Sequence, residues 1–225
     1  MRNPFNPNQE LYMCSSFNGY PVQTKHGALV TQYLVKLNNV FIDTMQQHSR
    51  TFAVRVDLRF SRKLDVPDIA RTNKPITSFL RSLESKLNHR DLMTRKNKGR
   101  CNPHGMRYAW AREIGADSGV PHYHLILFFN GDAYRSLGNY SDPEKPSLYR
   151  KMQEAWANAI GIPFDLADGL VSLPDRGQWM LRRGDHDMAA QVFYAASYLC
   201  KASSKVYELG FHGFDCSRPR TIPFA

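Results

Sequence analysis

The stretch PHYHLILFFN, residues 121–130, restricts the possible folds of this chain most strongly. After its two histidines it is apolar at five consecutive positions, 125–129, so both faces of a strand formed here would be buried. RYAWAREI, 107–114, has the pattern of a strand as well, and GADSGVP, 115–121, has the composition of a hairpin connection. The sequence therefore predicts an antiparallel hairpin whose second strand lies centrally in a sheet.

The other hydrophobic periodicities predict helices and strands in alternation. TFAVRVDLRF, 51–60, places apolar residues on one face and charged residues on the other, which is typical of a half-buried strand. Four stretches have apolar residues at helical spacing, namely 29 to about 47, 76–87, about 146–160 and about 187–205. Short strands are expected at 169–173 and 178–182. Strands joined largely by hairpins, with helices between them, indicate an α+β fold with helices packed on an antiparallel sheet.

Length and composition indicate one domain. The chain has 225 residues, of which 42% are hydrophobic, which is enough for one core. Residues 1–27 are polar and rich in Asn, Gly and Pro, so we expect a loosely held arm before a domain at 28–225. The four cysteines form no C-x-x-C pair, which favours reduced structural thiols. Without a membrane-spanning stretch or a signal-peptide core, the sequence predicts a cytoplasmic protein with no membrane partner.

The charge balance points to a class of partner. Thirty Lys and Arg residues against twenty Asp and Glu residues give a formal net charge of +10. A basic protein of this size commonly binds a polyanion, most often a nucleic acid. The candidates for contact with phosphates are Arg55, Arg59, Arg95, Lys96, Lys98, Arg100, Arg107 and Lys205. For the basic loop at 95–107, a merely solvated charged turn is the alternative.

Two histidines at the start of the central strand suggest a metal site. In a strand, His122 and His124 point to the same face about 7 Å apart, and imidazole is a common metal ligand. Glu113, near the end of the preceding strand, is the first candidate for a third ligand, and Asp57 is the second. Two imidazoles and a carboxylate with open positions suit a hydrated divalent ion. The alternative is a pair of exposed histidines beside a carboxylate that is solvated or paired with the nearby Arg112.

Two tyrosines and two lysines share one side of the predicted last helix: Tyr194, Tyr198, Lys201 and Lys205. Tyrosines at the edge of the core are the alternative explanation. A phenol has a pKa of about 10 and is a poor nucleophile, but a neighbouring cation favours the phenolate, and a metal polarises a phosphodiester. The sequence therefore predicts a tyrosine that attacks a DNA phosphate and becomes joined to it. Lys201, one turn beyond Tyr198, favours that tyrosine for the first attack.

These residues resemble the HUH endonucleases, which carry a His-hydrophobe-His motif and one or two tyrosines on a later helix. His122-Tyr123-His124 fits the first motif, and Tyr194-x-x-x-Tyr198-x-x-Lys201 is similar to the two-tyrosine motif of rolling-circle initiators from single-stranded DNA phages. More closely, the chain resembles inovirus-type replication proteins of the YagK/YfjJ C-terminal group, found in filamentous phages and prophages. The similarity covers roughly residues 50–220, with the pieces RVDLRF, YAWARE, PHYHLIL, EAW, GLVSLP, YAASYLCK and FDCSR in order.

The resemblance implies a ferredoxin-like or RRM-like α+β domain whose sheet cradles single-stranded DNA. It also implies Mg²⁺ or Mn²⁺, a 5′-phosphotyrosyl intermediate and a free 3′-OH that primes replication from an origin. By position Glu113 is similar to the family's variable third ligand, whereas Tyr123 replaces the usual aliphatic residue. Because no G-x-x-x-x-G-K-[ST] motif occurs, a host helicase is expected to separate the strands.

The main expectation is thus a site-specific single-strand endonuclease and strand transferase that initiates rolling-circle replication in a bacterial host cell. A non-catalytic DNA-binding prophage regulator is the alternative, although binding alone needs neither the histidine pair nor the tyrosine pair. A metallohydrolase acting on a small phosphoester leaves the tyrosines and the basic surplus unexplained. The sequence leaves open whether the chain works as a monomer or a dimer.

Overall fold

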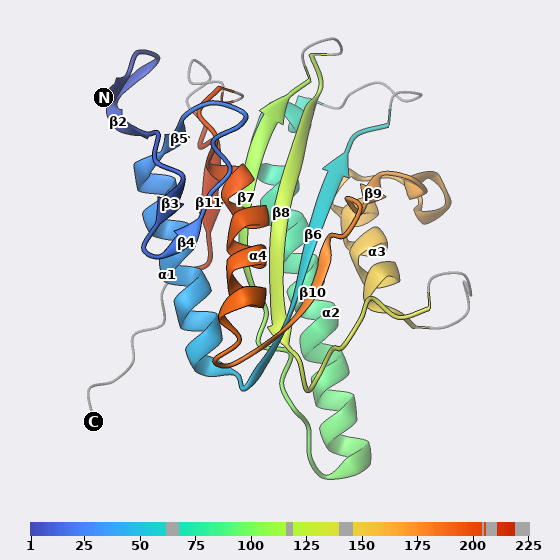
Figure 1. Ribbon diagram of the computed structural model, residues 1–225. Helices are drawn as coiled ribbons and strands as arrows, with labels where there is room; N and C mark the ends of the chain where they lie inside the picture. The colour runs from blue at the N-terminus through green and yellow to red at the C-terminus, as the bar shows by residue number, and fades with distance from the viewer. Residues whose placement is uncertain (62–67, 116–118, 140–145, 204, 206–210, 219–225) are drawn as a thin grey trace.

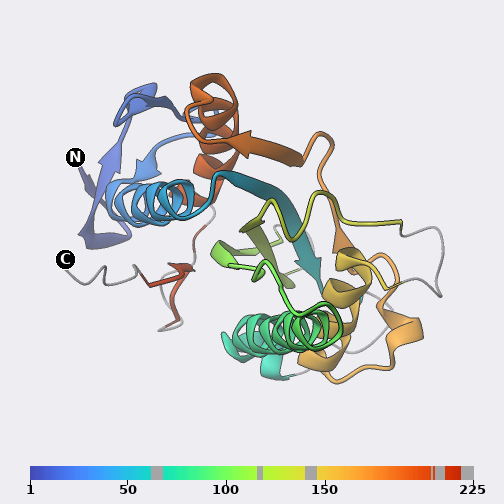
Figure 2. The same cartoon turned by 90° about the horizontal axis from the view of Figure 1, so that it is seen from below.

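The computed structural model describes the chain except for residues 62–67, 116–118, 140–145, 204, 206–210 and 219–225. A six-stranded antiparallel sheet lies between two layers of helices (Figures 1 and 2). Its strand order is β10–β6–β8–β7–β11, and β9 also pairs with β6. The strands are β6 (Arg50–Arg59), β7 (Arg107–Ile114), β8 (Pro121–Asn130), β9 (Val171–Ser172), β10 (Gln178–Arg182) and β11 (Phe214–Cys216). The predicted α+β class with an antiparallel sheet is confirmed.

The predicted hairpin is formed by β7 and β8, and β8 is central, between β6 and β7. Alternate residues of β8 enter two separate cores: Tyr123 and Leu125 face one, and Ile126 and Phe128 face the other. Since side chains repeat with a period of two, His124 lies on the same face as Ile126. The register then places His124 opposite Asp57 on β6.

Each face of the sheet is covered by two helices. In the described part of the chain these helices are α1 (Thr31–Gln47), α2 (Lys74–Lys98), α3 (Leu148–Ile160) and α4 (His186–Ser197). Figure 2 shows α1 and α4 on one side of the sheet and α2 and α3 on the other. Ser147 and Asp185 cap α3 and α4, because their side chains accept hydrogen bonds from the backbone N–H of Arg150 and Met188.

Helix α2 is longer than predicted. It continues to Lys98 and ends at Gly99, whose backbone is left-handed with φ of 69°. Such a glycine commonly ends a helix, and cations in the last turn complement the negative end of the helix dipole. Arg95, Lys96 and Lys98 are therefore helical residues, and the expected loop begins only after them.

The first 27 residues are not a loosely held arm. They contain the strands β1 (Arg2–Asn3), β2 (Asn6–Tyr12), β3 (Ser16–Phe17) and β4 (Tyr20–Pro21), and β2 pairs with β5 (Leu29–Val30). Val22 is buried, and the ring of Tyr20 packs against Phe41 of α1 and Phe193 of α4. These apolar residues are too widely spaced to show a period, which is why the sequence did not reveal the packing. The domain boundary after residue 27 stays a prediction.

The last helix is shorter than predicted. Helix α4 ends at Ser197, and the 3-10 turn η3 (Tyr198–Cys200) follows it. Lys201 then has an extended backbone and forms a β-bridge with Leu29, and the N–H of Ala202 donates to the carbonyl of Ala28 at 2.9 Å. These tertiary hydrogen bonds replace the helical ones, so Lys201 and Lys205 do not belong to the helix.

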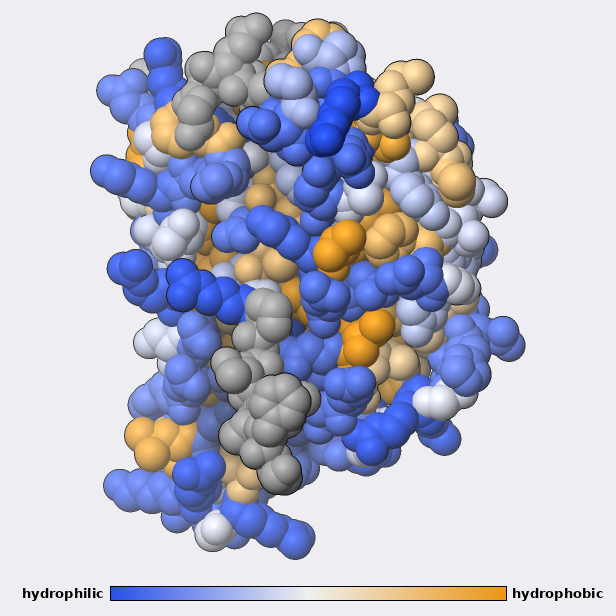
Figure 3. Space-filling model, turned by 90° about the vertical axis from the view of Figure 1, so that its left-hand side faces the viewer, coloured by the Kyte–Doolittle hydropathy of each residue, from blue (hydrophilic) through white to orange (hydrophobic). Residues whose placement is uncertain are grey.

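Figure 3 shows the side of the molecule that carries α1 and the N-terminal strands, where hydrophilic residues predominate and hydrophobic atoms appear in separate patches. Among the residues described here, none of the helices has the length and apolar character needed to cross a bilayer.

Candidate metal and tyrosine site

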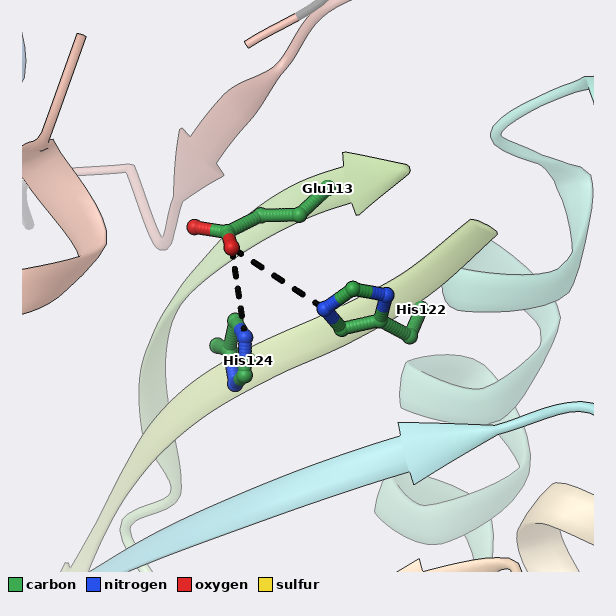
Figure 4. Close-up of side chains that lie close together, drawn as sticks. All are labelled: Glu113, His122 and His124. Carbon is green, nitrogen blue, oxygen red and sulfur yellow. Dashed lines mark ion pairs between the residues drawn. The ribbon is translucent and has the colours of Figure 1, made fainter. Parts of the chain in front are cut away.

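Glu113, His122 and His124 come together at the hairpin end of the sheet (Figure 4). Their possible ligand atoms all lie within 4.8 Å of one another. Oε2 of Glu113 lies 3.5 Å from Nε2 of His124 and 3.9 Å from Nε2 of His122. The register explains this proximity, because Glu113 on β7 is the direct cross-strand partner of His122 on β8. We call these three residues the triad.

Asp57 lies behind the triad instead of joining it. Its Oδ1 lies 2.6 Å from Nδ1 of His124, which leaves Nε2 of that imidazole for Glu113 or a metal. A carboxylate on the outer nitrogen of a ligating histidine fixes the tautomer and orients the ring. The second candidate for a third ligand is therefore placed as a support for His124, and Glu113 takes the third position.

The pKa values of the two histidines move in opposite directions. Burial lowers the pKa of His122, and the neighbouring His124 lowers it further. Burial also lowers the pKa of His124, but hydrogen bonds to Asp57 and Glu113 outweigh it, and the net pKa is raised. Burial raises the pKa of Asp57, yet the hydrogen bond and charge of His124 bring it below its ordinary value.

The donor set fits a divalent cation. Two imidazole nitrogens and one carboxylate oxygen on neighbouring strands can hold one face of a metal ion and leave the remaining positions open for water or a phosphate. The His122 side chain is 22% exposed, so this corner is accessible from outside.

Tyr198 lies directly beside the triad. Its ring is perpendicular to that of His124, with the ring centroids 5.3 Å apart. Nζ of Lys201 lies 2.6 Å from the phenolic oxygen and 4.1 Å from the centre of the ring. The predicted tyrosine and lysine thus meet the predicted metal ligands in one cluster.

Lys201 and Lys205 both bind Glu113, one at each oxygen. Nζ of Lys201 lies 3.2 Å from Oε2, and Nζ of Lys205 lies 3.3 Å from Oε1. The Lys205 side chain is completely buried, and this burial lowers its pKa although Glu113 opposes the effect. Lys205 was expected to contact a DNA phosphate, but the structure places it inside the protein as a partner of Glu113.

Arg55 and Arg107 are also buried, which corrects their expected place on a DNA-binding surface. Arg55 lies beside the ring of Tyr198, 5.2 Å from its centre, and donates to the carbonyl of Ala195 at 2.9 Å. Burial lowers the pKa of Arg55, and the charge of Asp57 opposes this shift. Arg107 pairs with Asp43 at 2.6 Å. An arginine on the inner face of a strand cannot be told from a surface arginine by sequence alone.

The other basic candidates fall into two groups. Arg59 is exposed and lies opposite His122 at the hairpin end of the sheet. Arg95, Lys96, Lys98 and Arg100 are exposed at the C-terminal end of α2, which is the opposite end of the molecule (Figure 1). Of these exposed candidates, only Arg59 is therefore near the triad.

Tyr194 is less closely connected to the triad than Tyr198. Its side chain is on α4, one turn earlier, and the residue is 38% exposed. Among the described residues its hydroxyl has no hydrogen bond, whereas its backbone carbonyl accepts from Gln23 and Ser197. The two predicted tyrosines thus occupy different environments.

His26 is a residue of the site that the sequence did not reveal. Its ring is perpendicular to that of Tyr198, with the centroids 5.5 Å apart. The segment that carries it is joined to the tyrosine segment, since the N–H of Gln23 donates to Oγ of Ser197 at 2.9 Å and Oγ of Ser203 donates to the His26 carbonyl at 3.3 Å. A lone histidine in a polar stretch gives no signal of such a role.

Fold and site together define a mixed α+β protein with a candidate metal triad beside a tyrosine. The family model of the YagK/YfjJ C-terminal domain matches residues 12–217, and the chain belongs to this family.

Two relatives from Escherichia coli (strain K12) match over most of their length. The chain is 30% identical to the uncharacterized protein YfjJ over 210 residues, which is 87% of this chain and 98% of YfjJ. It is 32% identical to the uncharacterized protein YagK over 209 residues, which is 87% of this chain and 97% of YagK. No solved structure matches the chain significantly, so the ferredoxin-like subclass stays a prediction.

Proposed function

We propose that this chain is a metal-dependent single-strand DNA endonuclease and strand transferase of the HUH class. The observation that carries the proposal is the position of Lys201, whose ammonium contacts both the Tyr198 hydroxyl and the Glu113 carboxylate of the triad. A nucleophile, a cation and a set of metal ligands thus share one accessible corner. Mg²⁺ or Mn²⁺ is the proposed metal, and rolling-circle replication of a phage or prophage is the proposed process.

In the proposed reaction the phenolic oxygen of Tyr198 attacks a backbone phosphorus and the bond from phosphorus to the 3′ oxygen breaks. The phenolic proton leaves to solvent, the released 3′ oxygen gains a proton, and the 5′ phosphate stays on the tyrosine. When bound by the triad, a divalent cation supplies charge stabilisation to the phosphate. Exchange of one phosphodiester for another conserves the bond energy, so a second attack can rejoin the strand.

The residues around Tyr198 suit this role. Lys201 and Arg55 place two positive charges beside the phenol. Cations at this position can stabilise the negative charge that develops on a phosphate in the transition state. The ring contacts with His124 and His26 hold the phenol in position beside the metal ligands. Tyr194, exposed one turn earlier, is the candidate for the second attack.

The proposed route of the DNA differs from the one that the family resemblance implied. Both faces of the sheet are covered by helices, so the middle of the sheet offers no open platform for a strand. DNA is proposed to enter at the hairpin end instead, where His122 is partly exposed and Arg59 is available for a phosphate. In this proposal the chain acts in the cytoplasm of a bacterial host, with a host helicase to separate the strands.

The test is covalent capture of DNA. Purified protein is incubated with a labelled single-stranded oligonucleotide from its own genetic neighbourhood, with Mn²⁺ or with EDTA, and the products are separated on a denaturing gel. We expect a metal-dependent adduct that Tyr198→Phe abolishes, while the matched variant Tyr194→Phe retains the first cleavage. An adduct that persists when both tyrosines are replaced would exclude the proposal. DNA binding without any metal-dependent nicking would instead support a non-catalytic regulator.

A further inference from the structure

The C-terminal end of α2 extends past the sheet at the end opposite the hairpin (Figure 1). The central strand β8 runs from one end of the molecule to the other. At one end His122 belongs to the triad. At the other end the side chain of Asn130 donates a hydrogen bond to the carbonyl of Pro103, in the segment that follows α2. From His122 to Asn130 there are eight residue steps, which at about 3.3 Å each amount to roughly 26 Å. A ligand at this end of α2 is therefore not at the triad.

A hollow of about 450 Å³ lies beside this end of α2. Arg90, Thr94 and Lys98 line it at a spacing of four residues, so they share one side of the helix. The left-handed backbone of Gly99 ends the helix, and the chain turns so that Arg100 lines the same hollow. Helix and turn together thus build a concave surface with three cationic side chains.

The carboxylates near the hollow already have partners. Asp132, which lines it, is paired with Arg50. Asp91 binds Arg90 at 2.9 Å and accepts from the backbone N–H of His104 at 2.7 Å. By contrast, Lys98 and Arg100 are exposed and have no ion pair with any residue that the structure describes. The hollow therefore carries an excess of positive charge.

The chemistry of the hollow suits a phosphate of a nucleic-acid backbone. Guanidinium and ammonium groups are the usual phosphate binders, and a guanidinium can bind in a bidentate manner. Sites for single strands also offer aromatic rings on which bases stack. The guanidinium of Arg90 covers one face of the nearby Tyr134 ring, with its carbon 4.9 Å from the centre of the ring, so that face is not available for stacking. The described residues that line the hollow include no aromatic ring, and contact with phosphates through charge is the pattern of sequence-independent binding to duplex DNA.

We infer that the hollow at the C-terminal end of α2 is a second DNA site, which binds the phosphate backbone of duplex DNA flanking the nicked strand. The choice of DNA among polyanions rests on the proposed function. The stretch of β8 from His122 to Asn130, roughly 26 Å long, corresponds to about eight base pairs of duplex DNA at 3.4 Å each. The duplex contact positions the chain, and the triad acts on the single strand beyond it.

The test compares two variants that lose the same charge. Lys98→Gln/Arg100→Gln changes the hollow, and Lys36→Gln/Arg81→Gln removes two exposed cations on α1 and on the middle of α2. Binding of each full-length variant to a fluorescent duplex of about 20 base pairs is measured by anisotropy between about 50 and 200 mM salt. For the hollow variant we expect about tenfold weaker binding than for the control, and a salt slope lower by about two, one for each lost phosphate contact.

Three outcomes would overturn the inference. Equal losses in the two variants would show that only net charge matters. A lower melting temperature with unchanged DNA binding would show that these cations serve only the end of the helix. Binding to polyglutamate, measured in the same way, gives the third outcome. If the hollow variant lost binding to polyglutamate but kept binding to the duplex, the partner would be an acidic protein. Adduct formation on a short single-stranded oligonucleotide, measured in parallel, tests the proposed function separately, because the hollow variant keeps the triad and Tyr198.

Discussion

The ammonium of Lys201 lies 2.6 Å from the phenolic oxygen of Tyr198, and the same nitrogen lies 3.2 Å from Oε2 of Glu113. That carboxylate oxygen is also the one that faces both histidines. A cation bound by the triad therefore competes with Lys201 for Glu113. When the cation displaces Lys201 from Glu113, the hydrogen bond from Lys201 to Tyr198 can remain. Lys201 thus links the proposed nucleophile to the metal ligands.

Replacing Lys201 with methionine should slow formation of the covalent adduct by about 100-fold to 1,000-fold, which is the usual cost of removing one stabilising donor from a reaction centre. Affinity for Mn²⁺ should stay equal or increase, because Glu113 no longer shares its oxygen with the ammonium. Single-turnover gels and calorimetry measure the two quantities, with Lys36→Met as the matched surface control. Loss of metal affinity together with activity would contradict this role.

Asp57 should control how the metal affinity depends on pH. A protonated imidazole cannot bind a metal, and the pKa of His124 lies above its ordinary value of 6.5 in the metal-free chain. Metal affinity should therefore rise with pH as His124 loses its proton. Asp57→Asn removes the carboxylate that raises this pKa, so the midpoint of the pH dependence of metal affinity should move to lower pH. Above that midpoint, the metal affinity of the variant should be about 10-fold to 100-fold lower than that of the unchanged protein.

The measurement is calorimetric titration with Mn²⁺ at several values between about pH 5.5 and pH 8.5. Asp43→Asn serves as a control, because Asp43 pairs with Arg107 and not with a metal ligand. A midpoint that stays in place, or moves to higher pH, would be inconsistent with the observed hydrogen bond.

His26 should contribute to the reaction by holding the ring of Tyr198. His26→Ala should reduce the rate of adduct formation by about threefold to tenfold, the amount that a perpendicular pair of rings contributes. His26→Phe should restore most of the rate because it keeps the ring contact, and the exposed neighbour Lys25 provides the control Lys25→Ala. If the phenylalanine variant is as slow as the alanine variant, the ring contact is not what matters.

Removing Lys205 should destabilise the metal-free protein. Lys205→Met leaves Oε1 of the buried Glu113 without its cation. Breaking such a buried pair should lower the free energy of unfolding by about 3 kcal/mol. This value is at the lower end of the usual range because Lys201 still binds the other oxygen of Glu113. Urea unfolding measures this change, and Mn²⁺ should recover part of the lost stability because it binds the folded state. An unchanged unfolding midpoint would refute the importance of the buried pair.

The strands of the hairpin and the triad could be predicted from the sequence because both follow from local periodicity. β7, β8 and β10 have the predicted bounds, and Glu113 lies opposite His122 because the hairpin connection sets the register. The C-terminal end of the last helix and the packing of the first 27 residues could not be predicted. In both cases the decisive hydrogen bonds join segments far apart in the chain, such as Leu29 with Lys201.

What the sequence determined by itself is the alternation that places His122 and His124 on one face of a central strand, and the +10 charge that indicates a polyanion. Only the tertiary structure decided which charged groups are buried around Glu113 and Tyr198, as Lys205 and Arg55 are, and which remain on the surface. The physical reason is that periodicity records which side of an element a residue is on, whereas burial depends on what packs against that side.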